Sequence, residues 1–132
     1  MTGSIEETIP LQEQAIRLSP RDPRIGLWYH RIGLVHLLQS CIDEATVWLE
    51  RARNAGPGLP YVRASLASAY ALKGEITRAE VELAKGRKLI SDNRYSSILC
   101  LKSLGDFGVP KVRALFEATY FAGLRKAGMP ED

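Results

Sequence analysis

The chain has 132 residues, of which 45% are hydrophobic and 25% are charged. This composition is typical of one ordinary globular domain and argues against a long disordered segment. The apolar runs are far shorter than the ~20 residues needed to cross a bilayer. Residues 1–10 contain two glutamates and no apolar signal core. We therefore expect a cytoplasmic protein that does not enter the membrane.

The formal net charge is only +3, and the lysines and arginines are mixed with acids in every segment. The densest basic cluster, KGRK at residues 85–88, is short and contains no aromatic side chain. Proteins that follow a nucleic-acid strand need a longer basic track with aromatic platforms for the bases. We therefore expect no nucleic-acid partner.

Helical periodicity fills almost every stretch between turn signals, and no stretch alternates apolar and polar residues long enough to form a strand. The main turn-forming segments are 18–23, 55–60, 91–93 and 105–110, with shorter breaks at 39–43 and 72–76. The sequence therefore predicts an all-α protein with about seven helices and short, antiparallel connections. The predicted helices span residues 4–18, 24–39, 43–55, 60–73, 76–90, 94–104 and 110–127.

The chain matches itself when it is shifted by 34 residues, with large residues on large ones and small on small. The aligned pairs include Leu66 on Ile32, Ala67 on Gly33, Ile76 on Ile42, Ala79 on Ala45 and Leu83 on Leu49. Small residues at fixed intervals mark places where two helices cross closely. Gly74 supplies the left-handed residue with which a helix commonly ends. The pattern therefore predicts that the segment 23–92 contains two copies of one helical repeat.

This pattern resembles the tetratricopeptide repeat (TPR) family, whose 34-residue unit is a pair of antiparallel helices. The resemblance implies a helix-turn-helix TPR solenoid, a superhelical α-α array that ends in a capping helix. The structural TPR positions in this chain are Gly33, Ala45, Ala52, Ala67, Tyr70, Gly74 and Ala79. The second repeat departs from the pattern, because Arg63 replaces an aromatic residue and Ser91 replaces the helix-ending proline.

The chain is expected to form a single TPR-like domain, 1–132. It divides into a partial repeat at 1–22, full repeats at 23–57 and 58–92, and a degenerate half repeat with a capping helix at 93–132. The last helix is amphipathic, with Val112, Leu115, Phe116, Tyr120 and Leu124 along one stripe. Besides capping the solenoid, this helix has two alternative roles: it folds back into the groove as a pseudo-ligand, or it pairs across a dimer.

In the TPR family the first helix of each repeat lines a concave groove that holds a peptide or a partner helix. The resemblance assigns this groove to Leu27, His30, Arg31, Leu34, Leu38, Tyr61, Ser65, Ser68, Leu72, Tyr95 and Lys102. The Lys, Asn and Arg residues that clamp a chaperone tail by its carboxylate are not matched here. The mostly apolar groove suits an amphipathic helix or an apolar segment of a protein partner. Alternatively, Leu34, Leu37 and Leu38 are core residues beneath the C-terminal helix.

The sequence carries no pattern that indicates catalysis. His30 and His36 lie on opposite sides of a helix and cannot share a metal ion. We expect His36 to be a partly buried structural residue and His30 to be more exposed. The cysteines Cys41 and Cys100 have no neighbours at ligand spacing and are expected to be buried or half-buried thiols. The GDFG at 105–108 lacks the other kinase motifs and reads as a turn. We therefore expect no enzyme activity, no metal and no cofactor.

A second resemblance concerns the run FEATYFAGLRKAGMPED at 116–132, together with SPRDPRIGLWYHRIGLVHLL at 19–38. These runs look like the C-terminal repeat segments of bacterial proteins in which a class III adenylate or guanylate cyclase, or a winged-helix domain, precedes the repeats. No catalytic residue of a cyclase maps onto this chain. The leading hypothesis is a non-catalytic TPR module that captures a protein or peptide partner. The alternatives are a regulatory segment of a cyclase-like signalling protein and a self-association element.

Overall fold

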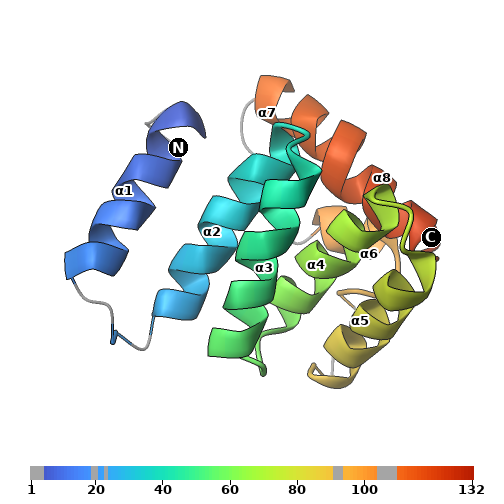
Figure 1. Ribbon diagram of the computed structural model, residues 1–132. Coiled ribbons are helices and arrows are strands. Elements are labelled where there is room, and N and C mark those ends of the chain that lie inside the picture. Colours follow the sequence, from blue (N-terminus) through green and yellow to red (C-terminus); the bar gives the residue numbers. More distant parts are fainter. Residues whose placement is uncertain (1–4, 19–20, 23, 91–93, 104–109) are drawn as a thin grey trace.

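A computed structural model shows an all-helical architecture (Figure 1). It describes residues 5–18, 21–22, 24–90, 94–103 and 110–132, and these ranges contain no strand. The helices are α1 (Ile5–Leu18), α2 (Ile25–Leu38), α3 (Ile42–Ala55), α4 (Pro60–Leu72), α5 (Ile76–Lys88), α6 (Ile98–Ser103), α7 (Pro110–Phe116) and α8 (Ala122–Lys126), with a π-helical turn, η1 (Glu117–Phe121), between the last two. The prediction of an all-α protein is confirmed. None of the described helices combines the length and the apolar character of a membrane span.

Helices α1 to α5 follow one another across the molecule, and each packs against its neighbour in the sequence (Figure 1). Helices α2 and α3 form one hairpin, and α4 and α5 form the next. The small residues Gly33, Ala45, Ala67 and Ala79 are all buried where these helices meet. A Cβ atom added to Gly33 would lie 2.7 Å from the Leu49 side chain, so this crossing requires glycine.

The turns inside the two hairpins have the same backbone structure at positions 34 residues apart. Ser40 (φ 64°) and Gly74 (φ 91°) both occupy the left-handed region. Each lies in a Schellman motif, in which two amides past the helix end bond back to its last turn. The outer bond of the motif joins Cys41 N–H to the His36 carbonyl at 2.8 Å in the first hairpin, and Glu75 N–H to the Tyr70 carbonyl at 2.9 Å in the second.

Buried charges and hydroxyls join the two hairpins. Glu82 on α5 accepts hydrogen bonds from Arg53 on α3 and Arg63 on α4, each at 2.8 Å. The Glu82 side chain is only 7% exposed, so both ion pairs are shielded from water. The Tyr70 hydroxyl donates to Glu50 on α3 at 2.6 Å. Because removal of one member would leave a buried charge without a partner, this cluster fixes how the second hairpin sits on the first.

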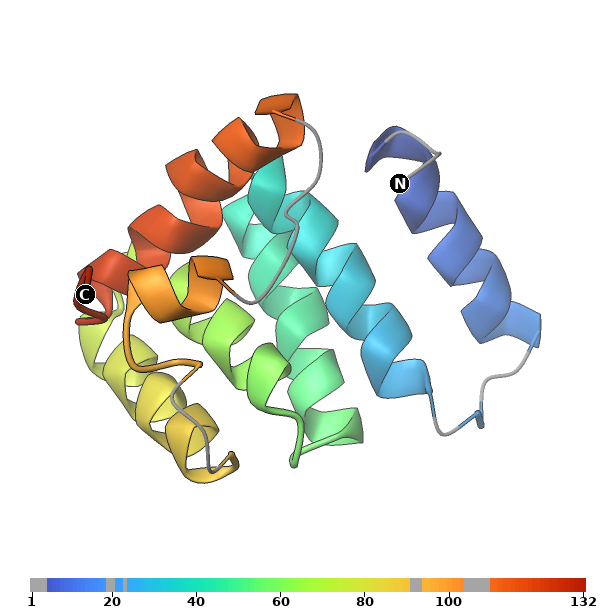
Figure 2. The same ribbon diagram turned by 180° about the vertical axis from the view of Figure 1, so that it is seen from behind.

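The C-terminal segment α7, η1 and α8 is one continuous helix that lies across the hairpins (Figure 2). It ends in a third Schellman motif, with Gly128 at φ 103°. Its side chains Tyr120, Phe121 and Leu124 belong to the same hydrophobic core as Leu66 and Tyr70 of α4. The core of the protein therefore lies between the hairpins and this helix.

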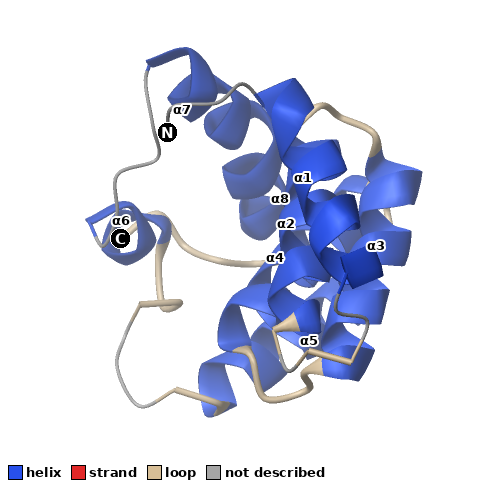
Figure 3. Cartoon of the chain, turned by 90° about the vertical axis from the view of Figure 1, so that its left-hand side faces the viewer, coloured by secondary structure: helices blue, strands red, loops and turns tan. Residues whose placement is uncertain are grey.

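Helix α6 begins later than the sequence predicts. The predicted helix spans 94–104, whereas α6 starts at Ile98, because the preceding residues supply its N-terminal cap: the Ser97 hydroxyl accepts the Cys100 N–H at 3.1 Å. The amides of Ile98 and Leu99 donate to the carbonyls of the C-terminal tail, each at 2.8 Å. Figure 3 shows α6 and the C-terminus on the same side of the molecule. The predicted breaks at 91–93 and 105–109, with the GDFG motif, lie outside the described residues.

The two left-handed residues give a matched test of the turn structure. Ser40→Gly should stabilise the protein by up to about 1 kcal/mol, because glycine adopts this conformation without Cβ strain. Gly74→Ala should destabilise it by about 1 kcal/mol or more for the same reason. Gly58 has no neighbour within 4 Å of its Cβ position and no positive φ, so Gly58→Ala serves as the control. Urea unfolding measures the free energy of unfolding of all three variants. Equal losses in Gly74→Ala and Gly58→Ala would contradict the left-handed conformation of Gly74.

Candidate functional site

The face that the sequence assigns to the groove is covered by the protein's own C-terminal helix. Segments η1 and α8 contact α4, and η1 also contacts α2. Of the predicted groove residues, His30, Leu38, Ser65, Ser68 and Tyr95 are buried, Leu27, Leu34, Tyr61 and Leu72 are half-buried, and Arg31 and Lys102 are exposed. We call the surface of α2 and α4 beneath the C-terminal helix the inner face. The sequence predicted an open groove here, whereas the C-terminal helix lies over this face and contacts α2 and α4.

Ser68 of α4 and Gly123 of α8 approach each other closely on the inner face. A Cβ atom at Gly123 would lie 2.2 Å from Ser68 Oγ and 2.5 Å from the Ser68 carbonyl oxygen. No side chain fits there, because real Cβ contacts are never this short. Ser68 itself is fully buried. The two helices therefore meet backbone to backbone, which only glycine permits at position 123.

The π-helical turn η1 supplies a hydrogen bond at this contact. The Ser68 hydroxyl donates to the Tyr120 carbonyl at 2.8 Å. A π turn shifts the backbone pattern from i+4 to i+5 and so leaves a carbonyl without its usual helical partner. The hydroxyl of a buried serine and the carbonyl of a buried turn thus satisfy each other, which avoids the cost of leaving either group unpaired.

Apolar side chains and a charged rim complete the contact. Tyr120, Phe121 and Leu124 are each less than a tenth exposed. At the edge, Glu117 pairs with Lys102 of α6 at 2.7 Å and with Arg125 at 2.6 Å. The hydrogen bond from Lys102 is the main reason that the pKa of the Glu117 carboxyl lies below its ordinary value. Lys102 was predicted to line an open groove. It instead forms an ion pair with Glu117 of the C-terminal helix, which we also call the resident helix.

His30 is buried beside this contact, although the sequence predicted that it would be the more exposed histidine. It is only 9% exposed, whereas His36 is half-buried. His30 Nε2 and Ser65 Oγ lie 2.9 Å apart, and the Tyr61 ring packs edge-on at 4.8 Å between centroids. Burial, and to a smaller degree the charge of Arg31, lower the pKa of His30 to about 4. The sequence could not reveal this, because the residues that bury His30 lie more than thirty positions away.

The His30–Ser65 pair has the distance expected of a base and a nucleophile, but its environment favours a packing role. Ser65 is 2% exposed. A histidine whose pKa is near 4 is a weak proton acceptor at neutral pH. Among the described residues no carboxylate bonds to the other ring nitrogen, and the third member that orients a catalytic histidine is not seen there. The pair satisfies two buried polar groups.

Within the described ranges, no three His, Cys, Asp or Glu side chains gather closely enough to hold a metal ion. The thiols do not both lie where the sequence placed them, since Cys41 is exposed at a helix start and only Cys100 is half-buried. Hydrogen bonds with Ser97 and Ser96 lower the pKa of the Cys100 thiol.

Comparison with protein-family models finds no match to this chain. A search of curated proteins finds no significantly similar relative.

The residues that sequence reasoning missed on the inner face are Gly123 and the turn at 117–121. The sequence does contain a signal for Gly123, because a glycine interrupts an otherwise amphipathic predicted helix. No sequence signal marks the π turn. Helices that pack with a small residue at the contact can approach closely, and here Gly123 permits that approach.

Protonation of His30 predicts a pH-dependent stability. The pKa is 6.5 in the unfolded chain and about 4 in the fold, so the unfolded state binds the proton more strongly and stability is lost as pH falls from 6.5 toward 4. Between pH 7 and pH 5 the loss should be about 2 kcal/mol from this group. His30→Gln keeps a polar partner for Ser65 and should lose about 2 kcal/mol less over the same interval. Urea unfolding at both pH values tests this, and an identical loss in both proteins would refute it.

Proposed function

We propose that this protein is a TPR-like interaction module that captures a helix on its inner face and has no catalytic chemistry of its own. The observation that carries the proposal is the amphipathic C-terminal helix seated on α2 and α4, across both hairpins. The recurrence of the hairpin turn after 34 residues supports the likeness to TPR units, which have this period. The fold alone would not establish a function, so the proposal rests on this contact.

The contact defines what kind of helix the inner face accepts. It needs a small residue where Gly123 meets Ser68, because any Cβ would clash there. It also needs large apolar side chains at the places of Tyr120 and Leu124, which fill the space beside the small residue. A partner helix should therefore have an aromatic residue three positions before a glycine and a leucine directly after it. Helix-in-groove binding of this kind depends on such spaced anchors.

The resident helix competes with any such partner. Because it belongs to the same chain, its effective concentration at the inner face is in the millimolar range or above. A free partner must therefore bind more tightly than the resident helix does at that concentration. The ion pairs of Glu117 with Lys102 and Arg125 lie at the edge of the contact, where they are open to competition from water and salt.

The experiment uses a fluorescein-labelled peptide of residues 110–130, added to the full chain and read by fluorescence anisotropy. In Gly123→Leu the native helix no longer fits against Ser68, so the inner face is left free for the peptide. This variant should bind the peptide at least about tenfold more tightly than the wild type. Ala118→Leu, on an exposed position of the same helix, is the control and should behave like the wild type.

Circular dichroism must show that Gly123→Leu keeps its helical content. If it does not, Gly123→Ala makes the same comparison with a smaller disturbance. A folded Gly123 variant that fails to bind the peptide would overturn the proposal, as would a wild type that binds it equally well.

A further inference from the structure

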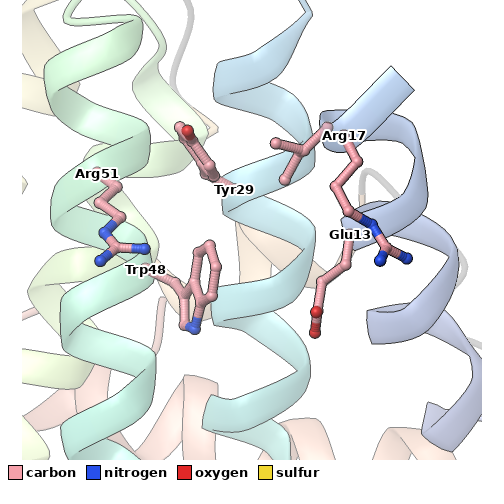
Figure 4. A pocket seen from close by; sticks show the side chains of 6 residues that line it. Glu13, Arg17, Tyr29, Trp48 and Arg51 are labelled. Atoms are coloured by element: carbon pink, nitrogen blue, oxygen red, sulfur yellow. The ribbon is translucent and has the colours of Figure 1, made fainter. Parts of the chain in front are cut away.

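A second recess lies away from the inner face, between α1, α2 and α3. It has a volume of about 250 Å³ and is lined by Glu13, Ile16, Arg17, Tyr29, Trp48 and Arg51. Figure 4 shows the rings of Tyr29 and Trp48 together, with Arg51 on one side of them and the α1 residues Glu13 and Arg17 on the other. None of these residues belongs to the hydrophobic core cluster. The recess is therefore not a packing defect of that core. We call it the α1–α3 pocket.

The floor of the α1–α3 pocket is aromatic and half-buried. The Tyr29 and Trp48 rings lie 5.8 Å apart between centroids and are inclined by 41°. The Arg51 guanidinium lies 4.8 Å from the centre of the Trp48 ring, a cation–π arrangement that holds the charge at the pocket edge. Such a floor binds apolar or planar groups, and a cation fixed beside it attracts an anion to the same place.

The polar groups around this floor are mostly hydrogen-bond donors. Among the described residues, neither Arg17 nor Arg51 has an ion pair or a hydrogen-bond partner. In contrast Arg53, two positions from Arg51, points to the other side of α3 and binds Glu82. The indole N–H of Trp48 is a further donor. Of the described residues that line the pocket, only Glu13 carries a carboxylate. A ligand rich in acceptors and negatively charged would complement this set.

Size narrows the choice of ligand. Pockets that enclose whole small-molecule ligands usually have volumes of about 300 to 1,000 Å³. At about 250 Å³ the α1–α3 pocket is smaller, and its charged residues are exposed. It has room for one or two side chains of a peptide that continues over the surface. Guanidinium groups bind the planar carboxylate group in a bidentate manner, which favours Asp or Glu as the anionic side chain.

We propose that the α1–α3 pocket binds an acidic peptide segment, with one carboxylate on Arg17 and another on Arg51 at its two edges and an apolar side chain between them on Tyr29 and Trp48. This site is separate from the inner face and does not depend on the function proposed for it. Glu13 lies on the α1 side with Arg17 and weakens the attraction of that side for an anion, so Arg51 provides the stronger of the two charge contacts. The protein would then hold a partner through charge at a place that its own C-terminal helix does not cover.

The probe is a fluorescein-labelled peptide of sequence Gly-Glu-Phe-Glu-Glu-Phe-Glu-Gly, compared with its twin in which every Glu is replaced by Gln. With the full wild-type chain, the acidic peptide should give a saturating anisotropy change and the glutamine peptide should not. Arg17→Gln and Arg51→Gln should each weaken binding about tenfold, since each removes a charge-assisted hydrogen bond. Trp48→Ala should also weaken it, although it leaves the charges in place.

Arg113→Gln on α7 is the matched control, because this exposed arginine lies outside the pocket. It should leave the affinity unchanged. If Arg113→Gln weakens binding as much as the pocket variants do, the peptide is held by diffuse attraction to a basic protein, and the proposal is wrong. The absence of saturable binding up to about 1 mM peptide, or equal binding of the glutamine twin, would also overturn it. All substituted residues are at least partly exposed, and unchanged thermal melting confirms that the variants are folded.

Discussion

The close approach of Gly123 to Ser68 is the constraint on which the arrangement of this protein depends. It lets the C-terminal helix lie directly on α4, so that Tyr120, Phe121 and Leu124 complete a core to which the hairpins contribute only one side. The two hairpins leave apolar side chains on their inner surfaces, and burial of such side chains is favourable. The C-terminal helix covers these side chains and belongs to the same hydrophobic core. The cost is a surface that a partner cannot reach without displacing part of the core.

This constraint extends to the parts of the chain that hold the helix. The tail after Gly128 turns back and its carbonyls accept the first amides of α6, so the C-terminus positions α6 together with the local Ser97 cap. Helix α6 in turn places Lys102 beside Glu117. The buried cluster around Glu82 fixes α4 relative to α3 and α5, and thereby fixes the position of Ser68. A change in any of these contacts is therefore expected to shift the helices at the Ser68–Gly123 contact, since packed cores transmit strain.

Local patterns sufficed to predict the helices, because period and turn residues act over a few positions. The ends of α1 to α5 agree with the predicted ranges within two residues, and Gly74 takes the left-handed conformation that its place at a helix end required. Ser40 has the same conformation in the predicted break at 39–43, although its residue type alone does not indicate a left-handed backbone. The burial of His30 and the cap of α6 depend on residues far along the chain. In the α1–α3 pocket, the sequence indicates that Trp48 and Arg51 lie on the polar side of one helix. It does not indicate that Glu13 and Arg17 form the opposite wall, because that depends on how α1 packs.

The inner face makes mainly apolar contacts, whereas the α1–α3 pocket offers exposed charges. Binding at the two surfaces should therefore differ in its dependence on salt. Most of the contact on the inner face is made by buried apolar side chains, so salt should affect it little beyond its charged rim. The α1–α3 pocket has exposed guanidinium groups whose attraction for an anion is screened within about 8 Å at physiological ionic strength. Other large apolar side chains on the described surface, such as Leu11 on α1, Val47 on α3, Val81 on α5 and Leu99 on α6, are distributed over several helices and require no binding role. A partner that binds through both surfaces would gain affinity from the link between its two contacts. Such a partner would need a linker between its helix and its acidic segment that is long enough to reach from the inner face on α4 to the α1–α3 pocket.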